Sequence, residues 1–197
     1  MKYENLREIY DKITTPFELL EFMDNYIQFG FYGNNNKLYD TSDLDAFELA
    51  SETFWNLSSP SHTLKNGYGQ CFDQVELERD WFVKNGYDCK TLYITFLVSG
   101  INSYPVHAYL AFKNHGKWYW FEHCDKANKG IHEYESLEEL ITDQMTKHIY
   151  FTDRFNPLDD DILDCLHIFD YKSPIYGLSK KGFQSFVMAS DEVPIVE

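Results

Sequence analysis

Apolar residues in the first sixty positions recur every three or four residues, which is the spacing of one face of an α-helix. A short helix is predicted over residues 2–13, and a second starts at Pro16, since proline fits the first turn of a helix. The apolar positions of this second helix continue to Ile27, and a third helix is predicted over residues 44–57. Two segments rich in glycine, asparagine and serine are expected to be irregular: residues 33–43 and 58–70.

The middle of the chain changes from helical to alternating periodicity. A helix is predicted over residues 71–83, with Asn85 and Gly86 as its C-terminal stop. Segments rich in β-branched and aromatic residues follow, and two of them flank a turn near Gly116, which predicts a hairpin. A further helix is predicted over residues 136–149. The predicted strands are residues 89–99, 104–114, 118–124 and 164–172.

The order of elements, helices first and an antiparallel sheet afterwards, is typical of the α+β class. The 197 residues are enough for one domain with a full hydrophobic core. We expect a single domain over residues 1–197, with a helical N-terminal part over 1–60. A core over residues 64–126 and C-terminal helix and strand elements over 127–197 complete it.

Composition and charge narrow the classes of partner. Hydrophobic residues make up 44% of the chain and aromatic residues 18%, a content that argues against disorder. The formal net charge is −15, and no basic stripe is present. Such a chain repels phosphate backbones and anionic lipid surfaces, so we expect neither a nucleic-acid nor a membrane partner. The oligomeric state is left open.

The cysteines give information about the cellular compartment and about the redox state of the thiols. The four are Cys71, Cys89, Cys124 and Cys165, and none belongs to a CxxC pair. The first twenty residues carry acids throughout and do not resemble a signal peptide, and no apolar run has the length of a membrane span. We therefore expect a cytoplasmic protein with reduced thiols.

The stretch "GYGQCF" places Cys71 where a glycine-rich turn passes into a helix. A buried structural thiol is one interpretation, because free cysteine is among the most buried residue types. The alternative is a reactive thiolate, since a helix N-terminus stabilises negative charge. Alternation along the predicted hairpin puts His107 and Glu122 diagonally on one face, within reach of each other. A base oriented by an acid is what a catalytic thiol requires, and Asp125 is the rival for the acid.

These residues resemble the transglutaminase-like superfamily, within the wider group of papain-like cysteine enzymes. "YGQCF" is similar to the "YGQCW" of the transglutaminase core, and His107 in "HAYLAF" and an acid after "GKWYWFE" follow in the family's order. "GYDCKTLYI" sits where the family carries "G(I/Y)xxR" before its first strand, so the likeness spans about residues 64–126. The chain departs from the family at Glu122, where aspartate is usual, and at Phe72, where tryptophan is usual, and it has no calcium loop.

The resemblance implies a papain-like fold in which a catalytic-type helix packs on an antiparallel sheet, and a Cys-His-Glu triad. Cys71 would attack the carbonyl of a protein or peptide-like amide, His107 would move the proton, and Glu122 would orient His107. The acyl group would pass to water or to an amine, with no cofactor and no metal. The backbone N–H of Cys71 would be one oxyanion donor, and the remaining oxyanion or cleft candidates are Gln70, Tyr68, Trp55, Trp118 and Trp120.

Two other classes of function are left open. One is a binding module that keeps the same fold without the chemistry, which the acidic composition and the Glu122 departure would suit. The residues "EHCD" over 122–125, with His115, His132 and Cys71, would be the ligands of a metal-dependent hydrolase, although no pair has the spacing of a known structural site.

Overall fold

The computed structural model describes residues 3–98, 105–154, 157–158 and 160–194. Residues 99 and 104, which the sequence places at the ends of two predicted strands, lie outside these ranges. The helices of the described residues are α1 (Tyr3–Tyr10), α2 (Pro16–Tyr26), α3 (Leu44–Thr53), α4 (Pro60–Asn66), α5 (Cys71–Lys84), α6 (Leu137–Asp153), α7 (Asp160–Leu163) and α8 (Lys180–Met188).

Two sheets form the β structure. The larger is antiparallel throughout, in the order β7-β6-β5-β4-β8-β9, and the smaller has the order β2-β1-β3. In the smaller sheet β1 runs antiparallel to β2 and parallel to β3. The strands are β1 (Gln28–Tyr32), β2 (Leu38–Asp40), β3 (Tyr68–Gly69), β4 (Asp88–Phe96), β5 (His107–Asn114), β6 (Lys117–Glu122), β7 (Gly130–Tyr134), β8 (Leu166–Tyr171) and β9 (Asp191–Glu192).

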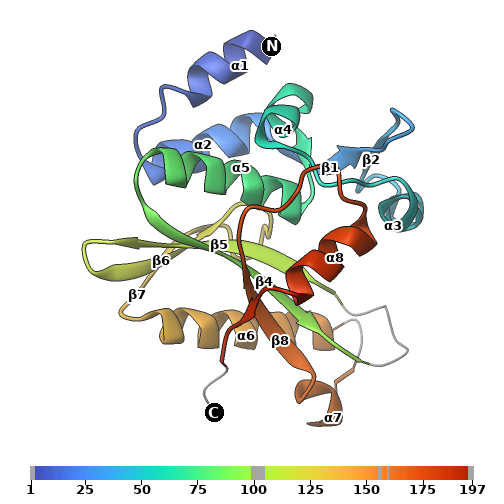
Figure 1. Cartoon of the computed structure of the whole chain (residues 1–197), viewed down its shortest axis with the longest axis vertical. Coiled ribbons are helices and arrows are strands. Elements are labelled where there is room, and N and C mark those ends of the chain that lie inside the picture. The colour runs from blue at the N-terminus through green and yellow to red at the C-terminus, as the bar shows by residue number, and fades with distance from the viewer. Residues whose placement is uncertain (1–2, 99–104, 155–156, 159, 195–197) are drawn as a thin grey trace.

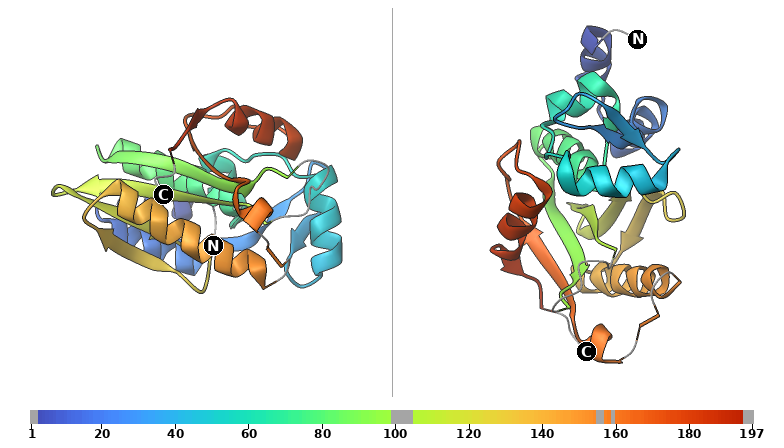
Figure 2. Two further views of the ribbon diagram at one scale, coloured as in Figure 1. Left: turned by 90° about the horizontal axis from the view of Figure 1, so that it is seen from below. Right: turned by 90° about the vertical axis from the view of Figure 1, so that its right-hand side faces the viewer.

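Helices cover both faces of the larger sheet, as Figures 1 and 2 show. On one face, α5 packs against β4 and β5 through an aromatic core that includes Phe82 and Phe112, and α8 buries Phe183 over β8. On the other face, α6 buries Leu140 and Ile141 against the apolar side chains of the central strands. Mixed helices and antiparallel strands confirm the α+β class.

The predicted second helix starts at Pro16 as expected and ends one residue before Ile27, the last apolar position assigned to it. Pro16 occupies the first turn, and Thr15 and Glu18 form a reciprocal capping box. The helix ends at Tyr26, because the next residues hydrogen-bond as β1 to β2 and β3. Strand β3 is distant in sequence and β2, although near, is only three residues long, so local periodicity does not reveal β1.

The two segments expected to be irregular contain structure. Residues 33–43 include β2, and residues 58–70 include α4 and β3. Helix α4 carries readable start signals, because Ser59 caps it and Pro60 is its first residue. The third helix ends at Thr53 and not at 57, and β7 is an additional strand that pairs with β6. The N-terminal sixty residues therefore hold two strands as well as helices.

Candidate active site

Cys71 is the first residue of α5, and a buried carboxylate holds the chain there. Asp73 accepts hydrogen bonds from the indole Nε1 of Trp55 at 2.9 Å, the backbone N–H of Ser58 at 2.7 Å and that of Gln70 at 2.9 Å. Burial raises the pKa of Asp73 to about 7, although these hydrogen bonds oppose the rise. Asp73 thus links the turn before α5 to residues 55–58, and this link sets the position of Cys71.

His107 and Glu122 meet where β5 and β6 separate. Strand β5 begins at His107 and β6 extends to Glu122, but their ladder ends at the pair Leu110 and Phe121. The alternation predicted from the sequence is confirmed, since His107 Nε2 lies 2.8 Å from Glu122 Oε2. The His107 side chain is 20% exposed and that of Glu122 only 2%. The bond at Nε2 leaves Nδ1 as the imidazole nitrogen free to interact with a thiol.

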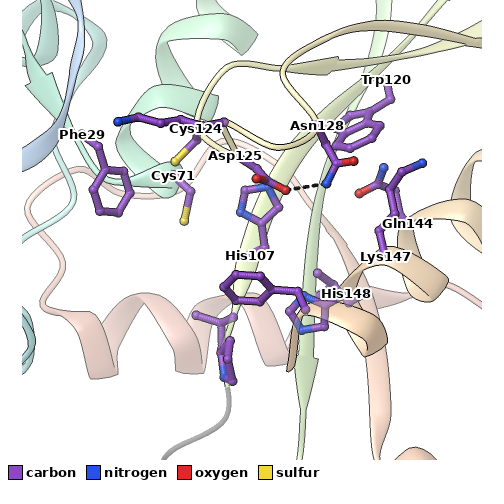
Figure 3. A pocket seen from close by; sticks show the side chains of 15 residues that line it. Phe29, Cys71, His107, Trp120, Cys124, Asp125, Asn128, Gln144, Lys147 and His148 are labelled. Carbon is purple, nitrogen blue, oxygen red and sulfur yellow. Dashed lines mark hydrogen bonds between the residues drawn. The ribbon is translucent and has the colours of Figure 1, made fainter. Parts of the chain in front are cut away.

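Cys71 reaches His107 across the end of the sheet (Figure 3). Cys71 as a residue is 7% exposed, and the pKa of its thiol is lowered to about 5. A hydrogen bond from Cys124 is the largest cause, burial opposes the shift, and hydrogen bonding and charge from His107 assist it. The pKa of Cys124 moves well above its ordinary value because it shares this hydrogen bond. In this pair Cys71 is therefore the thiolate and Cys124 the thiol donor.

Glu122 favours the protonated form of His107, and a backbone hydrogen bond holds the Glu122 carboxylate in place. Burial works against a protonated imidazole, but the charge of Glu122 and hydrogen bonds to Glu122 and Cys71 raise the pKa of His107 well above its usual value. The second oxygen of Glu122 accepts the backbone N–H of Asp125 at 2.7 Å. Asp125 is thus placed behind Glu122, and its carboxylate accepts from Asn128 and from the N–H of Ala127.

A cavity of about 290 Å³ connects these groups with α6 (Figure 3). Cys71, His107 and Cys124 line one end, and polar side chains of α6 line the other. The size is at the lower limit of small-molecule pockets. The residues of the wall are Phe29, Ile94, Pro105, Val106, Trp120, Asp125, Lys126, Asn128, Gln144, Lys147, His148 and Phe151, with the three named above.

Five further residues are expected from the sequence to be oxyanion donors or to line the cleft. One of them lines this cavity and four do not. Trp120 is in its wall, whereas Trp118 packs at the margin of the core beneath α6. Gln70 donates through Nε2 to the hydroxyl of Ser51 at 3.0 Å. Trp55 is committed to Asp73, and the ring of Tyr68 packs edge-on against another tyrosine, Tyr32.

The structure adds groups that sequence reasoning missed. Glu76 and Glu78, in the charge-rich stretch "ELERD", are both buried, and Glu76 pairs with Arg79. Glu78 lies two helical turns after Cys71, and its burial, followed by the charge of Glu122, raises its pKa well above normal. Gln144 and His148 are polar residues on the apolar face of α6. This interruption of the apolar pattern is the feature of the sequence that indicates an unusual role for them.

Within the described ranges, no three His, Cys, Asp or Glu side chains gather as metal ligands. His115 is in the turn between β5 and β6, and His132 stacks on Trp120. Among the helices that the structure describes, none has the length and apolarity of a membrane span. No protein-family model matches the chain, and no curated protein matches its sequence. What the fold and site define is an α+β protein with an aligned cysteine, histidine and glutamate.

Proposed function

We propose that the protein is a thiol-dependent enzyme that cleaves or transfers acyl groups at amide bonds, with a transglutaminase-like, papain-like core. One observation carries the proposal: a cysteine with a strongly lowered pKa, at a helix N-terminus, shares a cavity with a histidine that a buried glutamate binds. Four free cysteines suit a cytoplasmic location, as the sequence suggests.

The reaction begins with attack of the Cys71 thiolate on the carbonyl carbon of the amide, which forms a carbon–sulfur bond and an oxyanion. The backbone N–H of Cys71 at the start of α5 stabilises that oxyanion. Protonated His107 donates its Nδ1 proton to the amine nitrogen as the carbon–nitrogen bond breaks. Neutral His107 then removes a proton from water or from a second amine, which attacks the thioester and regenerates the thiolate.

The test is formation of the acyl-enzyme. Incubation with p-nitrophenyl acetate should release nitrophenolate in a burst and add one acetyl group to Cys71, as peptide mass spectrometry would show. Cys71→Ala should abolish the burst, while Cys89→Ala, which removes a cysteine outside the cavity wall, should preserve it. Adding a primary amine then separates transfer from hydrolysis. Acetylation spread over all four cysteines, with no burst, would contradict the proposal and favour a binding module.

A further inference from the structure

Three polar side chains on the α6 side of the cavity have atoms without partners. Among the described residues, Trp120 Nε1, Gln144 Nε2 and His148 Nε2 are buried atoms that form no hydrogen bond. All three side chains are less than a tenth exposed, and all three line the cavity that holds Cys71. A buried polar atom without a partner costs stability, so three in one wall indicate a site built for a ligand.

The fold brings the three groups together. Gln144 and His148 are four residues apart on α6 and therefore share one helix face. Trp120 lies on the same face of the larger sheet as His107 and Glu122, because alternate residues of β6 point to one side. Figure 3 shows Gln144 entering the cavity opposite Cys71, with His107 between them.

Their hydrogen-bonding character is specific. The indole of Trp120 and the amide nitrogen of Gln144 are donors. His148 hydrogen-bonds to the backbone of Pro105, and burial lowers its pKa to about 4, so the ring is neutral. With Nε2 unpartnered, the bond to Pro105 belongs to Nδ1, and Nε2 is left as an acceptor.

Two charged side chains of the cavity wall, Lys147 and Asp125, already have partners. Lys147 binds Asp143 and lies over the ring of Trp120, and Asp125 accepts from Asn128. The three unpartnered atoms themselves belong to neutral groups, and they comprise two donors and one acceptor. That set complements a neutral amide, whose carbonyl accepts two hydrogen bonds and whose N–H donates one.

We infer that Trp120, Gln144 and His148 form a subsite for a second amide group of the acyl donor, beyond the amide that Cys71 attacks. The inference rests on the proposed function. It makes the substrate class a chain with at least two amide groups, in which the reacting carbonyl is at Cys71 and the second amide is at α6. A substrate without the second amide leaves the three polar atoms unpaired and reacts more slowly.

The test uses chloromethyl ketones, which transfer their CH2 carbon to the Cys71 sulfur with loss of chloride. One series carries an acetamido group separated from the ketone by one, two or three methylene groups, and a matched series has plain alkyl chains. Rates of Cys71 alkylation are divided by the rates with glutathione to remove intrinsic reactivity. At one spacing the amide should react faster by about two- to tenfold for each hydrogen bond gained.

The variants are Gln144→Leu, Trp120→Phe and, as the control, Thr142→Leu on the exposed side of α6. The amide-to-alkyl ratio should fall toward one in the first two and stay at the wild-type value in the control. Equal rates for amide and alkyl probes at every spacing would overturn the subsite, as would faster reaction of a matched carboxylate series. Slow alkylation of wild-type Cys71 by iodoacetamide would instead overturn the proposed function, so the two failures are distinguishable.

Discussion

Replacing Glu122 with glutamine removes one charge from the site while keeping its shape. Glu122 Oε2 lies 2.8 Å from His107 Nε2, and its other oxygen accepts the N–H of Asp125 at 2.7 Å. In Glu122→Gln the amide oxygen keeps the bond to Asp125, and the amide nitrogen donates to His107. That donation requires a lone pair on Nε2, so the imidazole is neutral with its proton on Nδ1, facing Cys71. The thiolate then loses its positive partner.

The magnitude follows from the separation and the burial. A carboxylate this close shifts the pKa of a neighbouring group by about 1–3 units, and loss of the imidazolium should raise the pKa of Cys71 by about 2. From a pKa of about 5, the thiolate fraction at pH 6 then falls from about nine-tenths to about one-tenth. We therefore expect Cys71 to react with iodoacetamide about tenfold more slowly at pH 6.

The assay is the rate of carbamidomethylation of the Cys71 peptide, followed by mass spectrometry. Glu133→Gln is the matched control, because Glu133 is an exposed acid of β7 that binds Lys117 and Tyr119. Circular dichroism and a urea melt establish that both variants are folded. An unchanged rate in folded Glu122→Gln, or an equal fall in Glu133→Gln, would refute the charge coupling through His107.

Three further perturbations have definite signs. Cys124→Ala removes the largest cause of the lowered pKa of Cys71, so alkylation at pH 6 should slow by about two- to tenfold, and an unchanged rate would show that the thiol–thiolate hydrogen bond is unimportant. Asp73→Asn turns an amide N–H2 toward backbone and indole donors, and urea unfolding should show a loss of about 1–3 kcal/mol; a smaller loss would contradict its anchoring role. The raised pKa of Glu78 means that the folded state keeps the Glu78 proton at pH values where the unfolded chain has released it. The contribution of Glu78 to the free energy of unfolding therefore falls as the pH rises above about 4.3. The free energy of unfolding of Glu78→Gln, relative to that of wild type, should rise by up to about 1.4 kcal/mol per pH unit between pH 5 and 7. A difference that stays the same across this pH range in urea melts would refute this.

Local signals in the sequence predict most of the large sheet and the helix that carries Cys71. Alternation along the hairpin also places His107 beside Glu122, because period-two geometry holds wherever strands pair regularly. The small sheet escapes prediction, since β1 pairs with β3, which is distant in sequence, and with β2, which is only three residues long. Cys124 escapes for a related reason, because it follows the end of β6, where alternation no longer defines direction.

The cavity is the part of the site that the sequence reveals least. It is formed between α6 and the sheet, so its polar wall depends on how two layers pack and not on any one motif. Gln144 and His148 interrupt an apolar helix face, which marks them as unusual without giving their partner. Burial of Glu78 is likewise a tertiary effect that a charge-rich segment conceals.

The pH dependence of Cys71 alkylation tests the central claim most directly. Iodoacetamide rates, resolved for each cysteine by mass spectrometry, are measured across pH for wild type and His107→Ala. We expect an apparent pKa near 5 for Cys71 in wild type. In His107→Ala it should rise toward the free value of about 8.5. A wild-type Cys71 that is inert, or that titrates like a free thiol, would contradict an activated cysteine–histidine pair.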